Sequence, residues 1–163
     1  MHEAEKIIVE LGLQPLPGEG GFFRQIWIAP LRPGETRSAT SIIHYLMTRE
    51  SFSALHRLAM RETWRFQAGD PVRLMQLGGP AGFEAVILGA NTARGEQPQA
   101  VVPAGVWQGA HLAEGASRGW ALLNCAVEPA WDERDFELGE RAALQREFPA
   151  AADEITRLTR DAF

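Results

Sequence analysis

The sequence is poor in cysteine, in long apolar runs and in positive charge. Its single cysteine, Cys125, excludes a disulfide within the chain, and the apolar run 121–127 around it predicts a buried strand residue, not a nucleophile. No run is apolar over the roughly 20 residues that a membrane helix needs. The net charge of −5 offers no basic face for nucleic acid. We therefore expect neither a nucleic-acid nor a membrane partner and, because the N-terminus lacks the basic start of a secretion signal, a cytoplasmic location.

The length and composition favour one globular domain. A chain of 163 residues, 45% of them apolar, is long enough to bury a core of its own. Apolar residues spaced as on one helix face predict a helix over residues 2–11, ending at Gly12. We expect a barrel over about 21–138, followed by a tail (139–163) of two short helices broken at Pro149.

The middle of the chain has the pattern of many short strands. Apolar and β-branched runs alternate with Gly- and Pro-rich turns, which is typical of a β-sandwich or barrel. The predicted strands cover residues 22–28, 38–47, 52–58, 62–67, 72–77, 83–88, 99–102, 106–110 and 120–127. By periodicity alone, residues 38–47 would also suit a buried helix, but the neighbouring short strands favour a strand.

The segment 52–69 holds the most informative residues. His56, Glu62 and Gly69 stand in order along it, with Trp64 and Phe66 between the last two. A hairpin between His56 and Glu62 would place both side chains on one face, because strand side chains alternate. The sequence therefore predicts a polar pair beside an aromatic wall.

These residues, with the segment 103–108, resemble the two motifs of a cupin. His56, Glu62 and Gly69 match the first motif, and Pro103 and Gly105 match the second. Two histidines of the general motifs are missing, since Leu58 and Gln108 stand in their places. Because transition metals favour imidazole ligands, we expect no metal and no cofactor.

A more specific resemblance covers about residues 7–145. The chain is similar to the cupin family known as DUF985 or Cupin 5. The shared motifs are GGFFR (20–24), FSALHR (52–57), RETWRF (61–66), VPAGVW (102–107), CAVEP (125–129) and DFEL (135–138). The chain departs from the family pattern at three positions, Gln25, Arg61 and Arg65, and strand alternation favours an outward Arg65.

The resemblance implies a mainly β cupin fold. The expected form is a double-stranded β-helix, or jelly-roll barrel, with a short N-terminal helix, C-terminal helices and a small-molecule ligand inside. Family members are similar to sugar-nucleotide epimerases and also to seed-storage cupins that catalyse nothing. Cupins of this kind commonly pair, and we expect a homodimer with the strand 22–28 as the contact.

An epimerase requires a base, an acid and a group that stabilises the enolate. We expect His56 as the base, because its ordinary pKa lies near neutral pH, and Glu62 as its partner. The expected substrate-binding residues are Trp64, Phe66, Trp107, Gln108, Arg24 and Tyr45. Arg24 suits either an anion clamp or a surface cation.

Three hypotheses follow from these residues. The first is a metal-independent isomerase or epimerase of a carbohydrate-like or nucleotide-linked substrate. The second is a non-catalytic cupin that binds a small ligand, in which His56 and Glu62 simply bond each other. The third, disfavoured by Leu58 and Gln108, is a metal-dependent dioxygenase.

Overall fold

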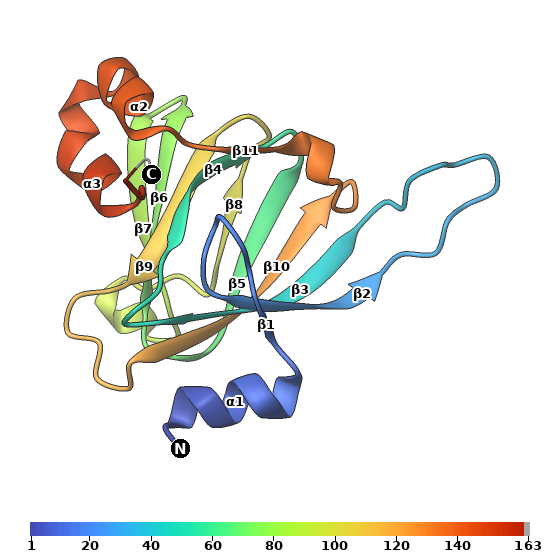
Figure 1. The fold of residues 1–163 in the computed structure, drawn as a ribbon, viewed down its shortest axis with the longest axis horizontal. Helices are drawn as coiled ribbons and strands as arrows, with labels where there is room; N and C mark the ends of the chain where they lie inside the picture. The colour runs from blue at the N-terminus through green and yellow to red at the C-terminus, as the bar shows by residue number, and fades with distance from the viewer. Residues whose placement is uncertain (162–163) are drawn as a thin grey trace.

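Two antiparallel sheets form the molecule, a computed structural model that describes residues 1–161. The first sheet has the order β1 (Gln14–Pro15), β2 (Phe22–Ile28), β3 (Ser41–Thr48), β10 (Trp120–Glu128), β5 (Arg61–Gly69) and β8 (Gln99–Val102). The second has the order β11 (Phe136–Leu138), β4 (Ser53–Leu58), β9 (Trp107–Leu112), β6 (Val72–Gly79) and β7 (Gly82–Leu88). The predicted jelly-roll architecture is confirmed (Figure 1).

Short helices lie at both ends of the chain. They are α1 (Glu3–Leu11), α2 (Arg141–Glu147) and α3 (Ala152–Arg157), with 3₁₀ turns η1 (Thr92–Arg94), η2 (Glu133–Asp135) and η3 (Pro149–Ala151). Gly12 ends α1 in the left-handed conformation, as predicted. No helix among residues 1–161 is long and apolar enough to cross a membrane.

Apolar side chains are buried in three layers. The largest cluster lies between the two sheets and includes Tyr45, Trp64, Leu74 and Leu123. The outer face of the second sheet packs under α2 and α3, whereas α1 covers the outer face of the first sheet around Leu46. Each sheet therefore has one face toward the common interior and the other toward a helix (Figure 1).

Two sequence predictions need correction. The strand expected at 38–47 begins only at Ser41, which is where pairing with both β2 and β10 starts. The prediction of a hairpin between His56 and Glu62 is wrong, because β4 pairs with β9 and β11, whereas β5 pairs with β10 and β8. The chain crosses from one sheet to the other at Ala59–Met60, so the two strands face each other across the interior.

The strand β2 leaves apolar side chains in solvent. Ile26, Trp27 and Ile28 are 41–49% exposed. Neighbouring β1 pairs only with its start, at Phe22 and Phe23. The homodimer contact expected at this strand stays a prediction.

Gly69 ends β5 at a place where the backbone of β10 approaches closely. Its φ is +97°, and a Cβ added there would lie 2.3 Å from the carbonyl oxygen of Trp120. The next residue, Asp70, accepts hydrogen bonds from the backbone N–H groups of Ser117, Arg118 and Gly119. The glycine of the first cupin motif therefore lets the end of β5 pack closely against the start of β10.

We predict that Gly69→Ala lowers the free energy of unfolding by about 3 kcal/mol, because a methyl group has no room beside a backbone carbonyl. Gly95→Ala is the matched control, since Gly95 also has a positive φ but open space around its Cβ position. It should cost only about 1 kcal/mol of conformational strain. Urea unfolding of both variants measures the difference, and equal losses would contradict a steric role for Gly69.

Candidate functional site in the barrel interior

His56 lies on β4 and faces the interior of the barrel. Its side chain is 2% exposed, and its Nδ1 lies 2.7 Å from the carbonyl oxygen of Ala54. A carbonyl oxygen only accepts, so Nδ1 carries the proton and donates it there. When this imidazole is neutral, its lone pair is therefore at Nε2.

The Nε2 atom of His56 faces a carboxylate that the sequence analysis missed. Glu19 Oε1 lies 3.9 Å from it and also accepts a 2.8 Å hydrogen bond from the hydroxyl of Ser53. Glu19 is buried although it belongs to the Pro- and Gly-rich loop before β2. Nothing in such a loop distinguishes a buried glutamate from a solvated one, so only the fold reveals it.

Glu62, Gln108 and Trp64 form a chain of hydrogen bonds across the interior. The indole N–H of Trp64 donates to Gln108 Oε1 at 2.7 Å, and Gln108 Nε2 donates to Glu62 Oε2 at 2.8 Å. An indole nitrogen only donates, so it fixes the orientation of the amide. Gln108 therefore presents its NH₂ group to the carboxyl of Glu62.

The carboxyl of Glu62 is held near the midpoint of its titration at neutral pH. Burial raises the pKa of Glu62 to about 7, because desolvation penalises the anion. The nearby His56 opposes this shift, and the carboxyl of Glu19 adds to it. Glu62 can therefore either give or accept a proton at physiological pH.

Cys125 and Tyr45 keep their protons in this interior. Burial raises the pKa of both groups well above their ordinary values. The Cys125 thiol donates to Glu62, and the Tyr45 hydroxyl donates to the Gly20 carbonyl at 2.7 Å. Cys125 is thus a buried strand residue, as predicted, and Tyr45 lies edge-on to Trp64 with the ring centres 5.8 Å apart.

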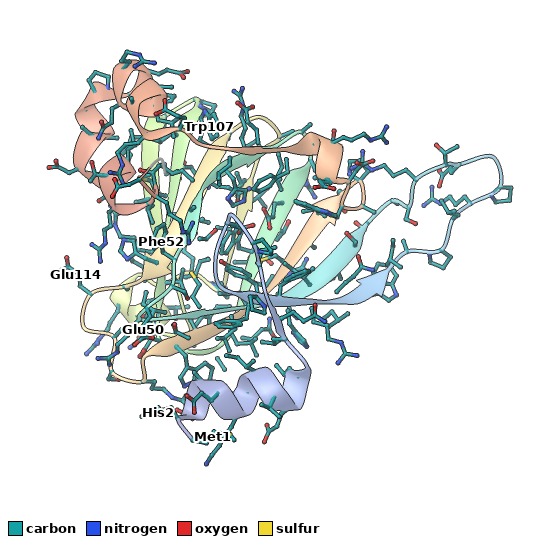
Figure 2. The ribbon with its side chains drawn as sticks, in the orientation of Figure 1. Met1, His2, Glu50, Phe52, Trp107 and Glu114 are labelled. Carbon is teal, nitrogen blue, oxygen red and sulfur yellow. The ribbon has the colours of Figure 1, made fainter. Side chains whose placement is uncertain are left out.

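The other predicted residues divide between the interior and the surface. Phe66 lies on the same side of β5 as Glu62 and packs against the interior cluster. Trp107 points out of the opposite face of β9 and packs with Leu144 of α2 (Figure 2). Arg24 is exposed and donates to the carbonyl of Leu11. The structure therefore brings His56, Glu62, Trp64, Phe66, Gln108 and Tyr45 together, but not Trp107 or Arg24.

The cations that depart from the family pattern lie outside the cluster. Arg61 is exposed and pairs with Glu128 at 2.7 Å. Arg65 is also exposed and lies near Gln99. Neither guanidinium lowers the pKa of Glu62, which agrees with the outward direction expected for Arg65.

Phe136 covers His56 at one end of the barrel. Its ring stacks on the imidazole with the centres 5.5 Å apart, and β11 pairs with β4 beside it. A surface cavity of about 270 Å³ lies against Phe136, Arg57 and Glu137. His56, Glu62 and Gln108 do not line this cavity, so Phe136 separates it from the imidazole.

The donor set in the interior does not suit a resident transition metal. Among residues 1–161, no three His, Cys, Asp or Glu side chains are grouped so that they could hold a metal ion. The cluster offers a single imidazole, His56, and the carboxyl of Glu62 is engaged by Gln108.

Comparisons with known proteins identify the family. The model described as Cupin superfamily (DUF985) matches residues 5–139, and the chain belongs to this family. A hypothetical protein from Leishmania major is 33% identical, with a TM-score of 0.88 over 97% of this chain and 99% of that one. A protein from Shewanella oneidensis is 31% identical, with a TM-score of 0.89 over 99% and 100%. The resemblance found in the sequence is confirmed.

A more distant solved structure shares the fold alone. A dTDP sugar isomerase from Desulfovibrio desulfuricans is 17% identical, with a TM-score of 0.54 over 78% of this chain and 80% of that one. None of the curated proteins compared with the chain matches it. Similarity therefore establishes the family, and the reaction has to be argued from the site.

We predict that Glu62→Gln removes a pH dependence of stability. The pKa of Glu62 in the folded protein, about 7, lies above the ordinary 4.5, so its contribution is full below pH 4.5 and is lost as pH rises through 7. Between pH 5 and 8, the wild-type free energy of unfolding should fall by up to about 3 kcal/mol relative to the variant. Denaturant unfolding at several pH values measures this difference.

The control for this experiment is Glu84→Gln, which removes an exposed carboxyl from β7. It should leave the pH profile of the wild type unchanged. Parallel profiles for wild type and Glu62→Gln would show that the buried carboxyl is not held protonated.

Proposed function

We propose that this chain is a metal-independent acid–base isomerase or epimerase of a small carbohydrate-like molecule, acting in the barrel interior. The observation that supports this best is the proximity of His56 and Glu62, which come from the two facing sheets and are both buried, with the pKa of Glu62 near 7. Pairs of titratable groups with different environments are typical of proton-transfer sites. The isomerase named among the structural neighbours acts on a dTDP sugar, which suggests a nucleotide-linked sugar as the first substrate to try.

The proposed reaction moves protons only. Nε2 of neutral His56 takes the proton from the carbon next to a carbonyl, and Glu19 stabilises the imidazolium that forms. The electron pair of the broken C–H bond moves into the enolate, whose oxygen Gln108 can approach with its NH₂ group. Protonated Glu62 then returns a proton to the carbon from the opposite side, and exchange with water resets both groups.

A substrate would enter by displacing Phe136. The ring stacks directly on His56, and the cavity of about 270 Å³ lies against its other side. Its strand, β11, pairs with the rest of the second sheet through β4 only. The segment that covers the imidazole is therefore held by fewer backbone bonds than a central strand.

A second function has its own support. Glu62, Gln108 and Trp64 each have a hydrogen-bond partner in the interior, as buried polar groups in stable folds generally do. Such a set of hydrogen bonds equally suits a non-catalytic cupin. In that case these side chains hold the two sheets together, and a ligand binds without reacting. The two functions differ in whether His56 is needed for turnover.

We predict that the wild type catalyses exchange of solvent deuterium into a dTDP-linked keto sugar and that His56→Asn lowers this rate at least about 100-fold. The matched control is His44→Asn, on β3 of the other sheet, where His44 bonds Asn124 outside the cluster. Mass spectrometry of the recovered sugar measures the exchange. Equal exchange in the wild type and His56→Asn would contradict a catalytic imidazole, whereas binding of the sugar without exchange would support the passive cupin.

We expect untagged protein purified without chelator to contain well below one transition metal per chain. The reason is the single imidazole of the cluster, with Leu58 and Gln108 where further imidazoles would be needed. Elemental mass spectrometry measures the content. About one metal per chain would contradict the acid–base mechanism and redirect the assays to metal chemistry.

A further inference from the structure

Glu19, the carboxylate that faces His56, belongs to a short glycine-rich loop between β1 and β2. We call residues 16–21 the Glu19 loop. Three of its residues have a positive φ, between +75° and +101°, namely Gly18, Gly20 and Gly21. Glycine loses more conformational freedom on folding than any other residue, so a loop of this composition needs outside contacts to keep one conformation. The direction of the Glu19 side chain is therefore set by the groups that hold the loop.

Arg160 holds the Glu19 loop from the C-terminal end of the chain. Its Nη1 donates to the carbonyl of Gly18 at 2.6 Å and to that of Glu19 at 3.1 Å. Its guanidinium also lies 4.4 Å from the ring centre of Phe52, which is beside the C-terminal helices (Figure 2). A Cβ added at Gly20 would lie 2.4 Å from Nη2 of Arg160, so only glycine leaves room for the guanidinium there. One side chain thus bonds the residue that carries the carboxylate and the residue before it.

The segment that carries Arg160 is itself anchored to the rest of the molecule. Leu158 is buried, and its carbonyl accepts a 2.8 Å hydrogen bond from the backbone N–H of Leu55 on β4. Thr159 is also buried, and Arg141 of α2 donates to its carbonyl at 2.7 Å and to its hydroxyl at 2.8 Å. Arg160 therefore acts on the loop from a fixed position, and its loss would release the loop and not the C-terminal segment.

On its inner side, the loop places the carboxylate in the interior cluster. Glu19 Oε1 accepts from the hydroxyl of Ser53 and lies 3.9 Å from Nε2 of His56. The negative charge of Glu19 also reaches Glu62, because it adds to the raised pKa of that carboxyl. A movement of the loop would therefore change the electrostatics of the site. The groups that face Glu62 from the elements around it are His56, Glu19, Gln108, Cys125 and Tyr45.

We propose that Arg160 is a positioning residue of the interior site, which holds the Glu19 loop from outside so that the carboxylate faces His56. Its own hydrogen bonds go to backbone carbonyls of the loop, so it acts on the site through Glu19. The inference rests on the proposed function, in which Glu19 stabilises the imidazolium of His56. The C-terminal segment thereby controls a site that lies inside the barrel.

The test is the titration of Glu62, followed by ¹³C NMR of the whole chain labelled at its glutamate carboxyls, with Glu62→Gln to assign the signal. Glu19→Gln should lower the titration midpoint of Glu62, because a nearby negative charge disfavours a second one. Arg160→Gln should lower the midpoint at least about half as much, because the released carboxylate moves toward solvent. Loss of the positive charge alone would raise the midpoint, since a cation favours the ionised carboxyl. The sign of the change therefore separates positioning from a direct charge effect.

The matched control is Arg157→Gln, an exposed arginine of α3 that lines an outer surface cavity and carries the same loss of charge. It should leave the midpoint of Glu62 as in the wild type. Arg160→Lys keeps the charge and can still donate to one of the two carbonyls, so its midpoint should lie between those of the wild type and Arg160→Gln. Arg160 is exposed, so we expect both of its variants to fold. An unchanged or raised midpoint in Arg160→Gln, or an equal fall in Arg157→Gln, would overturn the proposal.

This titration contains no substrate, so its result does not depend on whether the chain catalyses deuterium exchange. If exchange occurs, Arg160→Gln should lower its rate at saturating sugar about tenfold and leave KM unchanged, because Glu19 acts on the imidazolium and not on the bound sugar. A lowered midpoint without exchange in the wild type would support the positioning role of Arg160 and contradict only the proposed function.

Discussion

The hydrogen-bond chain through Gln108 joins the two sheets of this protein. Gln108 belongs to the second sheet, whereas its partners, Glu62 and Trp64, both lie on β5 of the first. Its amide needs a donor on one side and an acceptor on the other, so the position of β5 opposite β9 across the interior is fixed. A slip of β5 by one residue against β10 would turn Glu62 and Trp64 out of the interior and leave the amide of Gln108 unpaired.

The same chain of hydrogen bonds limits how a substrate could react in the barrel. A substrate that uses Gln108 or Glu62 has to replace hydrogen bonds that are already made, and it has to move Phe136 from the imidazole. The acid–base proposal therefore depends on an opening of β11, whereas the passive alternative does not.

The interior cluster and an outer surface cavity, which Arg49, His111 and Arg157 help to line, differ in charge for a structural reason. The interior contains two carboxylates and one imidazole, and burial favours the protonated form of Glu62. The outer cavity is lined by arginines at the edge of the sheet, where their long side chains reach solvent. The lining of the outer cavity is therefore basic, whereas the buried cluster of the interior is acidic.

The sequence by itself determined the strands, the two terminal helical segments, the family and the polar residues of β4, β5 and β9. Period-two alternation and glycine punctuation are local properties, so the inward direction of Glu62, Trp64 and Phe66 and the outward direction of Arg65 followed from them. Pairing between distant strands is not local. Only the tertiary structure showed that His56 and Glu62 lie near each other on facing sheets, brought Glu19 to the imidazole from a loop, and turned Trp107 toward α2.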